Sequence, residues 1–298
     1  MDAIEIRGLS KHFRGLYAVD SLDMTVPVGA IYGFIGENGS GKSTTMKLLC
    51  GHLVPDNGTI RLFGKAHTDA GVRVRVGALI ENAGCFPNAS VYQNLMMQAI
   101  NLNLEHPDAE ICRVLKIVRM EEHARLPFRK CSLGMKQRIG IAMALLGDPA
   151  LLILDEPING LDADGMRIVR DVLTDLATAG TTILISSHVL SELEKVATHY
   201  GIIRGGNMIR EMTAAELEEN CRTYITLRMQ EKNRAKALLS LRYSRVEEDE
   251  AGCIRVYDAV TPEELVTCLY ENGILISEVH TDKIGLEEYY TDLMKEGM

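Results

Sequence analysis

Residues 36–43 have types and a spacing suited to binding a phosphate chain. The segment GENGSGKS fits the pattern GxxxxGK[ST] and lies between an apolar run and a helix-like run. Glycines let successive backbone N–H groups turn inward around phosphate oxygens, and a helix that starts near Lys42 adds the positive end of its dipole. Lys42 can reach the β- and γ-phosphates, and the Ser43 hydroxyl can bind Mg²⁺. The segment therefore predicts a nucleoside triphosphate site rather than a plain glycine turn. The expected contacts come from Gly36, Asn38, Gly39, Ser40, Gly41, Lys42, Ser43 and Thr44.

Two carboxylates at the end of another apolar run could complete this site. Residues 151–157, LLILDEP, have the pattern of a buried strand and contain Asp155 and Glu156 at its end. Burying a carboxylate is costly unless it is paired, and Mg²⁺ would supply that pairing. Asp155 would hold the ion, and Glu156 would polarise the attacking water as a general base. The alternative is that both acids cap a surface loop.

The elements that must position these residues follow an alternating pattern. Short apolar runs alternate with helical patterns through the first 210 residues, which predicts an α/β fold with a largely parallel core sheet. Further antiparallel strands are also expected. The expected core strands cover residues 31–36, 74–81, 150–156 and 181–187, the antiparallel strands residues 4–9, 22–26 and 58–67, and helices residues 42–51, 90–102 and 162–180.

The pattern changes near residue 215. Residues 1–215 carry 22 Lys and Arg against 23 Asp and Glu, whereas residues 216–298 carry 10 against 18. The tail has the element order βαββαβ followed by a helix, which is typical of a small ferredoxin-like α+β domain. We therefore predict a nucleotide-binding domain over residues 1–215 and an accessory or regulatory domain over residues 216–298.

The composition argues against several other classes of protein. An acidic tail, no Trp and five Phe disfavour broad binding of nucleic acid or anionic lipid. Seven cysteines without a CxxC pair suggest neither a disulfide framework nor a zinc site, and fit a reducing compartment. The first residues lack the apolar segment of a signal peptide, and no apolar run approaches the roughly 18 residues of a membrane span.

Residues 131–135, CSLGM, precede the carboxylate strand and carry a resemblance to a family. The sequence resembles the ATP-binding subunits of ABC transporters, in which a signature, LSGGQ, lies at this place. Ser132 and Gly134 match that signature, while the other three positions depart from it. The resemblance implies a RecA-like core sheet, an antiparallel β subdomain and a helical subdomain. It also implies that Ser132 and Gly134 contact ATP held by a second subunit, so that two copies close on two ATP molecules. Leu133, in place of a glycine, predicts weaker closure, and the alternative is that Ser132 only caps a helix.

Four further positions match the family in the expected order. Phe13 matches the aromatic side chain that stacks on adenine, and Val19 would pack nearby. Asp162, in residues 159–162, belongs to the loop that crosses the dimer interface. His188 follows a buried strand, where the family places a histidine that contacts the γ-phosphate. The resemblance covers residues 3 to about 215, and its implied catalytic residues are Lys42, Glu156 and His188.

Glu81 is the most informative departure from the family pattern. The family normally has Gln at the end of this strand, where it contacts Mg²⁺ and water and senses the membrane partner. The surrounding segment, ALIENAGCF, resembles the branch that protects bacteria from bacitracin and lantibiotics, in which this loop carries Glu. We predict that Glu81 is an additional Mg²⁺ ligand that alters metal affinity. A solvated loop acid is the alternative.

The resemblance therefore implies an ATPase subunit that powers a separately encoded permease in the cell membrane. It also implies that the chain lies at the cytoplasmic face, reaches the membrane only through that permease, and drives the export of an antimicrobial peptide or drug. A soluble translation or repair ATPase is disfavoured, since only one phosphate segment is present and no coiled coil precedes the acids. A regulatory module without hydrolysis is disfavoured by the presence of Lys42, Asp155, Glu156 and His188.

Overall fold

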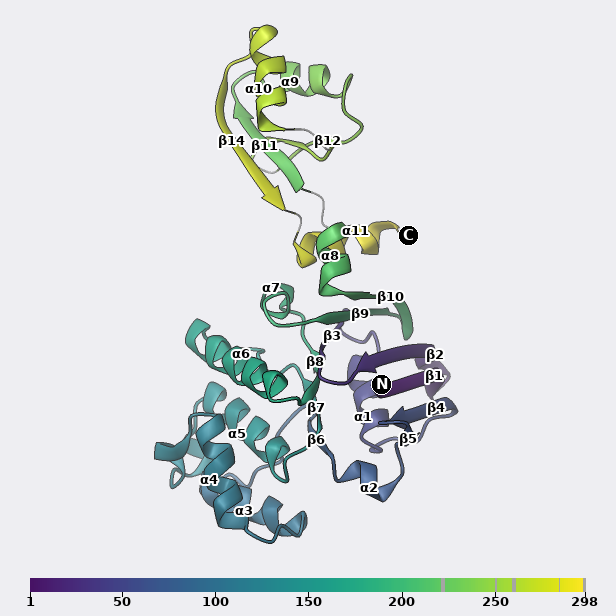
Figure 1. Ribbon diagram of the computed structural model, residues 1–298, viewed down its shortest axis with the longest axis vertical. Helices are drawn as coiled ribbons and strands as arrows, with labels where there is room; N and C mark the ends of the chain where they lie inside the picture. The colour runs from purple at the N-terminus through teal and green to yellow at the C-terminus, as the bar shows by residue number, and fades with distance from the viewer. Residues whose placement is uncertain (221–222, 250, 259–260, 284, 297–298) are drawn as a thin grey trace. The chain divides into compact units, whose positions relative to one another are not determined.

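Short buried strands form the parallel part of a six-stranded sheet at the centre of residues Met1–Ala214 (Figure 1). The structure, a computed structural model, describes residues 1–220, 223–249, 251–258, 261–283 and 285–296. The sheet has the order β10-β9-β3-β8-β7-β6, and only β10 runs antiparallel to its neighbour. The predicted parallel core strands are thus confirmed. Their bounds are β3 (Ile31–Ile35), β6 (Val76–Leu79), β7 (Leu151–Asp155), β8 (Thr182–Ser186), β9 (His199–Arg204) and β10 (Asn207–Thr213).

Parallel pairing brings the carboxyl ends of three strands to one edge of this sheet. Asp155, the last residue of β7, is paired with Ser186, the last residue of β8. Phe34 of β3 is level with the same serine. The segments that follow β3, β7 and β8 therefore leave the sheet at its carboxyl edge, where open α/β sheets bind ligands.

An antiparallel sheet shares its core with the parallel sheet. Its strand order is β2-β1-β4-β5. One apolar cluster includes side chains from both sheets and from helix α1 (Lys42–Leu49), among them Ile6, Tyr32 and Met46. The helix after the phosphate segment is therefore anchored in the core of both sheets. The antiparallel strands are β1 (Asp2–Phe13), β2 (Leu16–Pro27), β4 (Asn57–Leu62) and β5 (Lys65–Ala66).

A helical region follows β6 in the chain. Its first helix begins with a capping box, because Ser90 and Gln93 each accept a hydrogen bond from the other's backbone N–H. The buried Asn94 side chain binds the N–H and C=O of Phe86, which ties the preceding loop to this helix. The region contains α3 (Val91–Asn101), α4 (Pro107–Ile117), η1 (Glu121–His123), η2 (Phe128–Lys130) and α5 (Leu133–Leu145). The other helices of this unit are α2 (Ala70–Arg73), α6 (Ala163–Thr178) and α7 (Leu190–Leu193), and α8 (Ala214–Asn220) begins at its end.

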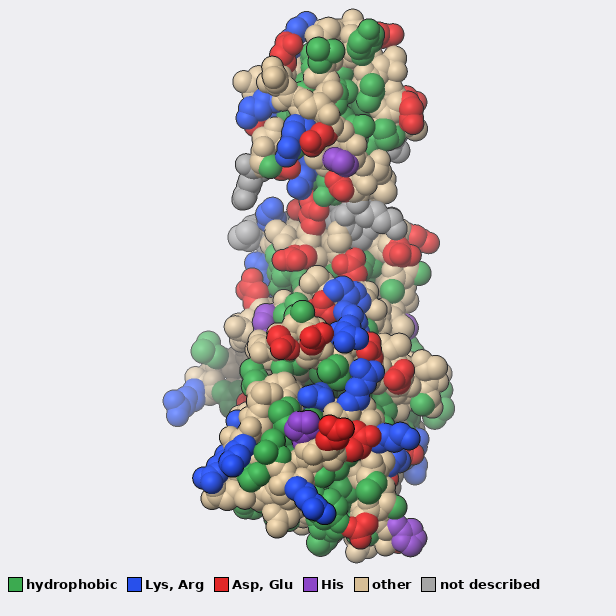
Figure 2. Space-filling view, turned by 90° about the vertical axis from the view of Figure 1, so that its left-hand side faces the viewer, with side chains coloured by type: hydrophobic (Ala, Val, Ile, Leu, Met, Phe, Trp, Pro, Cys, Tyr) green, Lys and Arg blue, Asp and Glu red, His purple; other side chains and the backbone are tan. Residues whose placement is uncertain are grey.

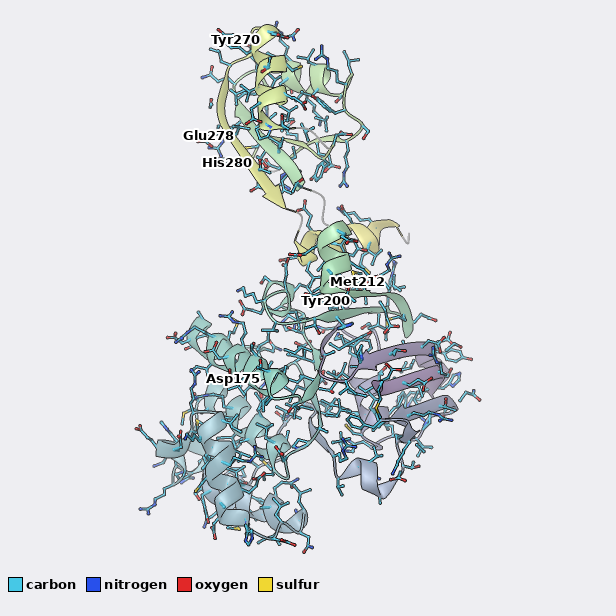
Figure 3. All side chains as sticks on the ribbon, viewed as in Figure 1. Asp175, Tyr200, Met212, Tyr270, Glu278 and His280 are labelled. Atoms are coloured by element: carbon cyan, nitrogen blue, oxygen red, sulfur yellow. The ribbon has the colours of Figure 1, made fainter. Side chains whose placement is uncertain are left out.

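The edge of the parallel sheet is closed by the antiparallel pair β9–β10. Tyr200 and Met212 lie opposite each other in this pair, and both side chains are buried (Figure 3). The Tyr32 hydroxyl of β3 donates a 2.6 Å hydrogen bond to Glu211 Oε1 of β10. Burial, and then the Glu211 charge, raise the pKa of Tyr32 well above its usual value. Tyr32 therefore remains a neutral hydrogen-bond donor that links β3 to β10.

Residues Ala215–Met298 form a second compact unit. Its four strands pair antiparallel in the order β12-β13-β11-β14, and the chain runs through them in the predicted order βαββαβ. The division of the chain lies beside the change in composition near residue 215. The elements are β11 (Thr223–Met229), α9 (Lys232–Leu239), β12 (Val246–Glu248), β13 (Ile254–Val256), α10 (Pro262–Glu271), β14 (Ile276–Lys283) and α11 (Leu286–Glu296).

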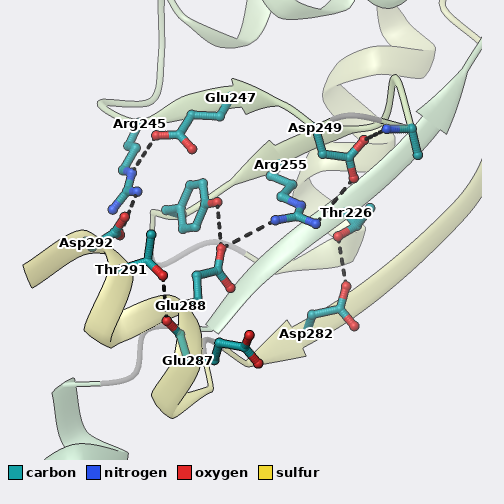
Figure 4. A network of polar contacts seen from close by, with 12 residues as sticks. Thr226, Arg245, Glu247, Asp249, Arg255, Asp282, Glu287, Glu288, Thr291 and Asp292 are labelled. Atoms are coloured by element: carbon teal, nitrogen blue, oxygen red, sulfur yellow. Dashed lines mark hydrogen bonds and ion pairs between the residues drawn. The ribbon is translucent and has the colours of Figure 1, made fainter. Parts of the chain in front are cut away.

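The two faces of this second sheet are covered in different ways. Ile254 and Val256 lie in an apolar cluster with residues of α9 and α10, whereas Arg255 between them points to the opposite face. There Arg255 forms a 3.4 Å ion pair with Glu288 of α11, as Figure 4 shows. Arg245 forms a similar pair with Asp292 at 3.1 Å. Ion pairs therefore join helix α11 to this face of the sheet, and Leu286 at the start of the helix is fully buried.

Charges of both signs are mixed on the surface. On the face seen in Figure 2, the described Lys and Arg side chains lie among Asp and Glu side chains rather than in one basic patch. Among the described residues, no helix is both long and apolar enough to cross a membrane.

Candidate nucleotide site

The phosphate segment connects β3 directly to α1, as its motif requires. A Cβ atom on Gly36 would lie 2.5 Å from the carbonyl oxygen of Ile203, and one on Gly41 would lie 2.4 Å from that of Ala18. Gly41 also has a φ of 110°, in the region that favours glycine. Close backbone packing therefore requires glycine at both positions and gives the loop its shape.

Lys42 lies across its own loop. Its Nζ donates to the carbonyl oxygens of Gly36 at 2.6 Å and Glu37 at 3.0 Å. Burial lowers the pKa of Lys42, while the charges of Glu156 and Asp155 act in the opposite direction. The ammonium thus interacts with the predicted metal ligand Asp155, with the predicted general base Glu156 and with the loop, where a phosphate chain would give it a stronger partner. Ser40 Oγ is buried without a hydrogen-bond partner among the described residues, which fits a loop built to bind a further polar group.

Asp155 is held by a serine that was not predicted as a site residue. Asp155 is 6% exposed, and its Oδ1 accepts a 2.5 Å hydrogen bond from Ser186 Oγ. The same hydroxyl accepts a 3.0 Å bond from the backbone N–H of Glu156. Ser186 therefore orients one carboxylate oxygen of Asp155 and fixes the start of the next residue.

Glu156 and His188 form a pair at the carboxyl edge of the sheet. His188 Nδ1 lies 2.7 Å from Glu156 Oε2. The backbone of Glu156 has a φ of 51°, which is strained for a residue other than glycine. Its carbonyl accepts a hydrogen bond from Gln137 Nε2 of α5. The strained turn aims the carboxylate at the histidine, which is the arrangement expected of a general base and the group that orients it.

A cavity of about 390 Å³ brings Glu81 to the same place as the two acids. The cavity is lined by Glu81, Leu133, Gln137, Asp155, Glu156, Asn159 and Gly160. Glu81 is exposed and forms a 2.6 Å ion pair with Lys47 of α1. The structure thus places Glu81, Asp155 and Glu156 around one cavity. It also shows that Glu81 pairs with Lys47, a residue that belongs to no motif of the sequence.

The CSLGM segment forms the start of α5. Ser132 is the N-cap, since its Oγ accepts a 3.2 Å hydrogen bond from the backbone N–H of Met135. Leu133 is exposed and close to Gly160, where an added Cβ atom would lie 2.9 Å from its Cδ2. Asp162 is the N-cap of α6 and accepts from the N–H of Gly165. Ser132 and Asp162 therefore both cap helices in this structure.

The two residues predicted near adenine lie in different surroundings. Phe13, at the end of β1, is 45% exposed, with the Lys11 ammonium 5.6 Å from its ring centre. Val19 of β2 is fully buried in the apolar cluster shared by the two sheets. Only Phe13 of this pair is therefore accessible to a base. Ser43 and Thr44 are half-buried in the first turn of α1, and Gly39 and Asn38 are exposed in the loop.

The side chains of this site suit a metal ion that binds together with a phosphate substrate. No group of three His, Cys, Asp or Glu side chains in the described part of the chain could hold a metal by itself. Mg²⁺ is usually bound by one or two carboxylates and by the phosphates of the substrate. The buried Asp155 carboxylate beside a phosphate loop fits that ion.

We predict that Ser186→Ala lowers the apparent Mg²⁺ affinity of ATP hydrolysis by about 10-fold, because groups that orient a metal ligand commonly contribute 10- to 100-fold. The measurement is the rate of ATP hydrolysis against Mg²⁺ concentration. Ser187→Ala is the matched control, since the Ser187 hydroxyl accepts from the N–H of Val189 and makes no bond to Asp155. An unchanged Mg²⁺ dependence in Ser186→Ala would show that the hydrogen bond from Ser186 does not help Asp155 to bind Mg²⁺.

Comparison with known proteins agrees with this geometry. A family model described as ABC transporter matches residues 19–159. The bacitracin transport ATP-binding protein BcrA of Enterococcus faecalis is 36% identical over 99% of this chain and 97% of its own length. The lantibiotic transport ATP-binding protein SrtF of Streptococcus pyogenes is 38% identical over 70% of this chain and 90% of its own.

A solved structure has the same fold. The cbiO1 protein of Clostridium perfringens, part of the ABC transporter complex cbiONQ, aligns with a TM-score of 0.66 at 26% identity. The alignment covers 82% of this chain and 96% of that protein. The phosphate loop, the carboxylates at the same sheet edge and these similarities show that the chain belongs to the family of ABC transporter ATP-binding proteins, which bind and hydrolyse ATP.

Proposed function

We propose that this chain powers the export of an antimicrobial peptide of the bacitracin or lantibiotic type through a permease made by a separate chain. The observation that carries the proposal is the similarity to a bacitracin transport ATP-binding protein over 99% of the chain. That similarity extends through the second unit, whereas the similarity to the lantibiotic transport protein covers 70% of the chain. The chain would lie on the inner face of the membrane and reach it only through the permease.

The residues at the sheet edge would divide the hydrolysis of ATP among them. Asp155, Ser43 and Glu81 would hold Mg²⁺, which neutralises phosphate charge when it is bound. Lys42 would leave its loop carbonyls for the phosphates, and Glu156 would accept a proton from the attacking water. His188, 2.7 Å from Glu156, would orient that carboxylate and contact the γ-phosphate. Phe13 would stack on adenine.

Two copies of the chain would close on two ATP molecules. The start of α5 is a helix N-terminus, with Gly134 in its first turn and Ser132 at its cap. Such an N-terminus attracts anions. Ser132 and Gly134 would therefore contact the γ-phosphate of ATP in the partner copy, and Asp162 would lie in the loop that meets the partner. Nucleic acid is not among the expected partners.

The loop after β6 would transmit closure to the permease. It begins at Glu81 in the cavity and is tied to α3 by the bonds between Asn94 and Phe86. Movement of Glu81 would therefore reach the helical region through a short, hydrogen-bonded segment. We expect the permease to contact residues 81–92.

The experiment that tests this function is growth of a peptide-sensitive bacterium that produces the chain together with its permease. We expect protection against bacitracin or a lantibiotic, and no protection when the chain carries Glu156→Gln. Equal protection by the two forms would mean that ATP hydrolysis by this chain does not drive export. Protection against neither peptide class, with normal ATPase activity, would rule out the proposed cargo.

A further inference from the structure

The ion pair between Lys47 and Glu81 has no role in the proposed hydrolysis of ATP. Lys47 Nζ lies 2.6 Å from Glu81 Oε1, although the two residues come from α1 and from the loop after β6. No motif of the sequence includes Lys47. The pair therefore joins the phosphate-binding helix to the segment that we expect to meet the permease.

The position of Lys47 on α1 places its charge near the predicted Mg²⁺ ligands. Lys47 is four residues after Ser43, so the two side chains lie on the same face of the helix. Helical side chains lean toward the N-terminus, which brings the ammonium toward Ser43. Its partner Glu81 lines the same cavity as Asp155 and Glu156. The Lys47 ammonium thus pairs with a carboxylate that lines the same cavity as these two acids.

Glu81 has two further features, one of its backbone and one of its side chain, that would let its carboxylate change partner. Glu81 has a φ of 63°, and the N–H of Asn82 donates to the carbonyl of Ile80 at 2.9 Å across it. This is a three-residue turn with a strained central residue. The Glu81 side chain is also 62% exposed, so solvent and packing leave its carboxylate room to turn.

We propose that Lys47 is a positioning residue that competes with Mg²⁺ for the Glu81 carboxylate. The ammonium holds Glu81 in the arrangement of this structure. When Mg-nucleotide binds, Glu81 exchanges the ammonium for the divalent ion, and the loop after β6 separates from α1. Lys47 thus sets both the metal affinity of the site and the arrangement of the loop. The inference rests on the proposed role of Glu81 as an Mg²⁺ ligand.

A double-mutant cycle tests this exchange with Mn²⁺ as the probe. Binding of Mn²⁺ to the full chain with a non-hydrolysable ATP analogue is followed by electron paramagnetic resonance, without reference to activity. We expect Lys47→Met to tighten Mn²⁺ binding by about 3- to 10-fold, because it frees a carboxylate and removes a nearby cation. In the Glu81→Gln background the same substitution should have a clearly smaller effect, since no carboxylate can be released.

The outcomes distinguish a Glu81 carboxylate that changes partner from a Lys47 charge that acts only by its presence. A lysine that acts only through its fixed charge would shift Mn²⁺ affinity by the same factor with Glu or Gln at position 81, and that result would overturn the inference. Lys47→Arg should restore the parent affinity. Lys65→Met, which removes an exposed lysine of β5 outside the cavity lining, should change nothing. A parent chain that binds no Mn²⁺-nucleotide would instead contradict the proposed function.

Discussion

Glu156→Gln should reduce the rate of ATP hydrolysis by about 10²- to 10⁴-fold, the usual contribution of a positioned general base. The amide keeps the shape of the side chain and can still hydrogen-bond to His188, but it cannot accept a proton from water. The substitution leaves the phosphate loop and Asp155 untouched, so ATP affinity should stay within a few-fold of the parent. The measurements are phosphate release and equilibrium binding of ATP.

The matched control is Glu192→Gln. Glu192 of α7 also forms an ion pair, with Arg170 at 2.9 Å, but it does not line the cavity bordered by Glu81, Asp155 and Glu156. The Glu192→Gln variant should retain the parent rate of ATP hydrolysis. If Glu156→Gln hydrolysed ATP at the parent rate, Glu156 would not be the general base, and the strained turn that aims it at His188 would need another explanation.

Gly41→Ala should weaken ATP binding by about 10- to 100-fold, because left-handed backbone strain alone costs roughly 1–3 kcal/mol and the added Cβ also meets backbone. That Cβ atom would lie 2.4 Å from the carbonyl oxygen of Ala18, at a φ of 110°. The loop must therefore shift, and its N–H groups lose their inward arrangement. Equilibrium binding of ATP measures the effect.

Gly29→Ala separates strain from loss of the site. Gly29 has a similar left-handed φ of 78°, but its Cβ would meet nothing within 4 Å. It should lower the free energy of unfolding by about 1 kcal/mol and leave ATP affinity unchanged. Thermal unfolding of both variants shows whether each is folded. Parent-like ATP affinity in folded Gly41→Ala would mean that the loop tolerates a shift and that its backbone shape does not decide binding.

The sequence predicted the parts of the site that depend on local patterns. The strand, glycine-rich turn and helix around Lys42 each have a strong local signal, and the fully buried run that ends in Asp155 has another. Parallel strands end at one edge of a sheet, so the sequence alone was enough to place these two motifs together. The βαββαβ order of the second unit also followed from local patterns.

Other features depend on contacts between distant segments and left no local signal. Ser186 is one of several small residues in an apolar strand, and only the pairing of β8 with β7 brings it to Asp155. Lys47 is an ordinary helical lysine until Glu81 is placed beside it. The family resemblance predicted Val19 near adenine, and its full burial in the apolar cluster shared by the two sheets likewise depends on contacts between distant segments. Helix α4 was not predicted, although Pro107 at its start is a common helix signal.

The mass of the Glu156→Gln chain with Mg-ATP, measured by light scattering, tests the central claim most directly. The account predicts a dimer that forms with ATP and is lost with Ser132→Arg, because the arginine would block the γ-phosphate contact from the partner copy. Ser90→Arg is the matched control, since it also removes a helix cap, on α3, and should still dimerise. A mass that does not change with ATP, or a dimer that persists with Ser132→Arg, would contradict a shared site closed by CSLGM.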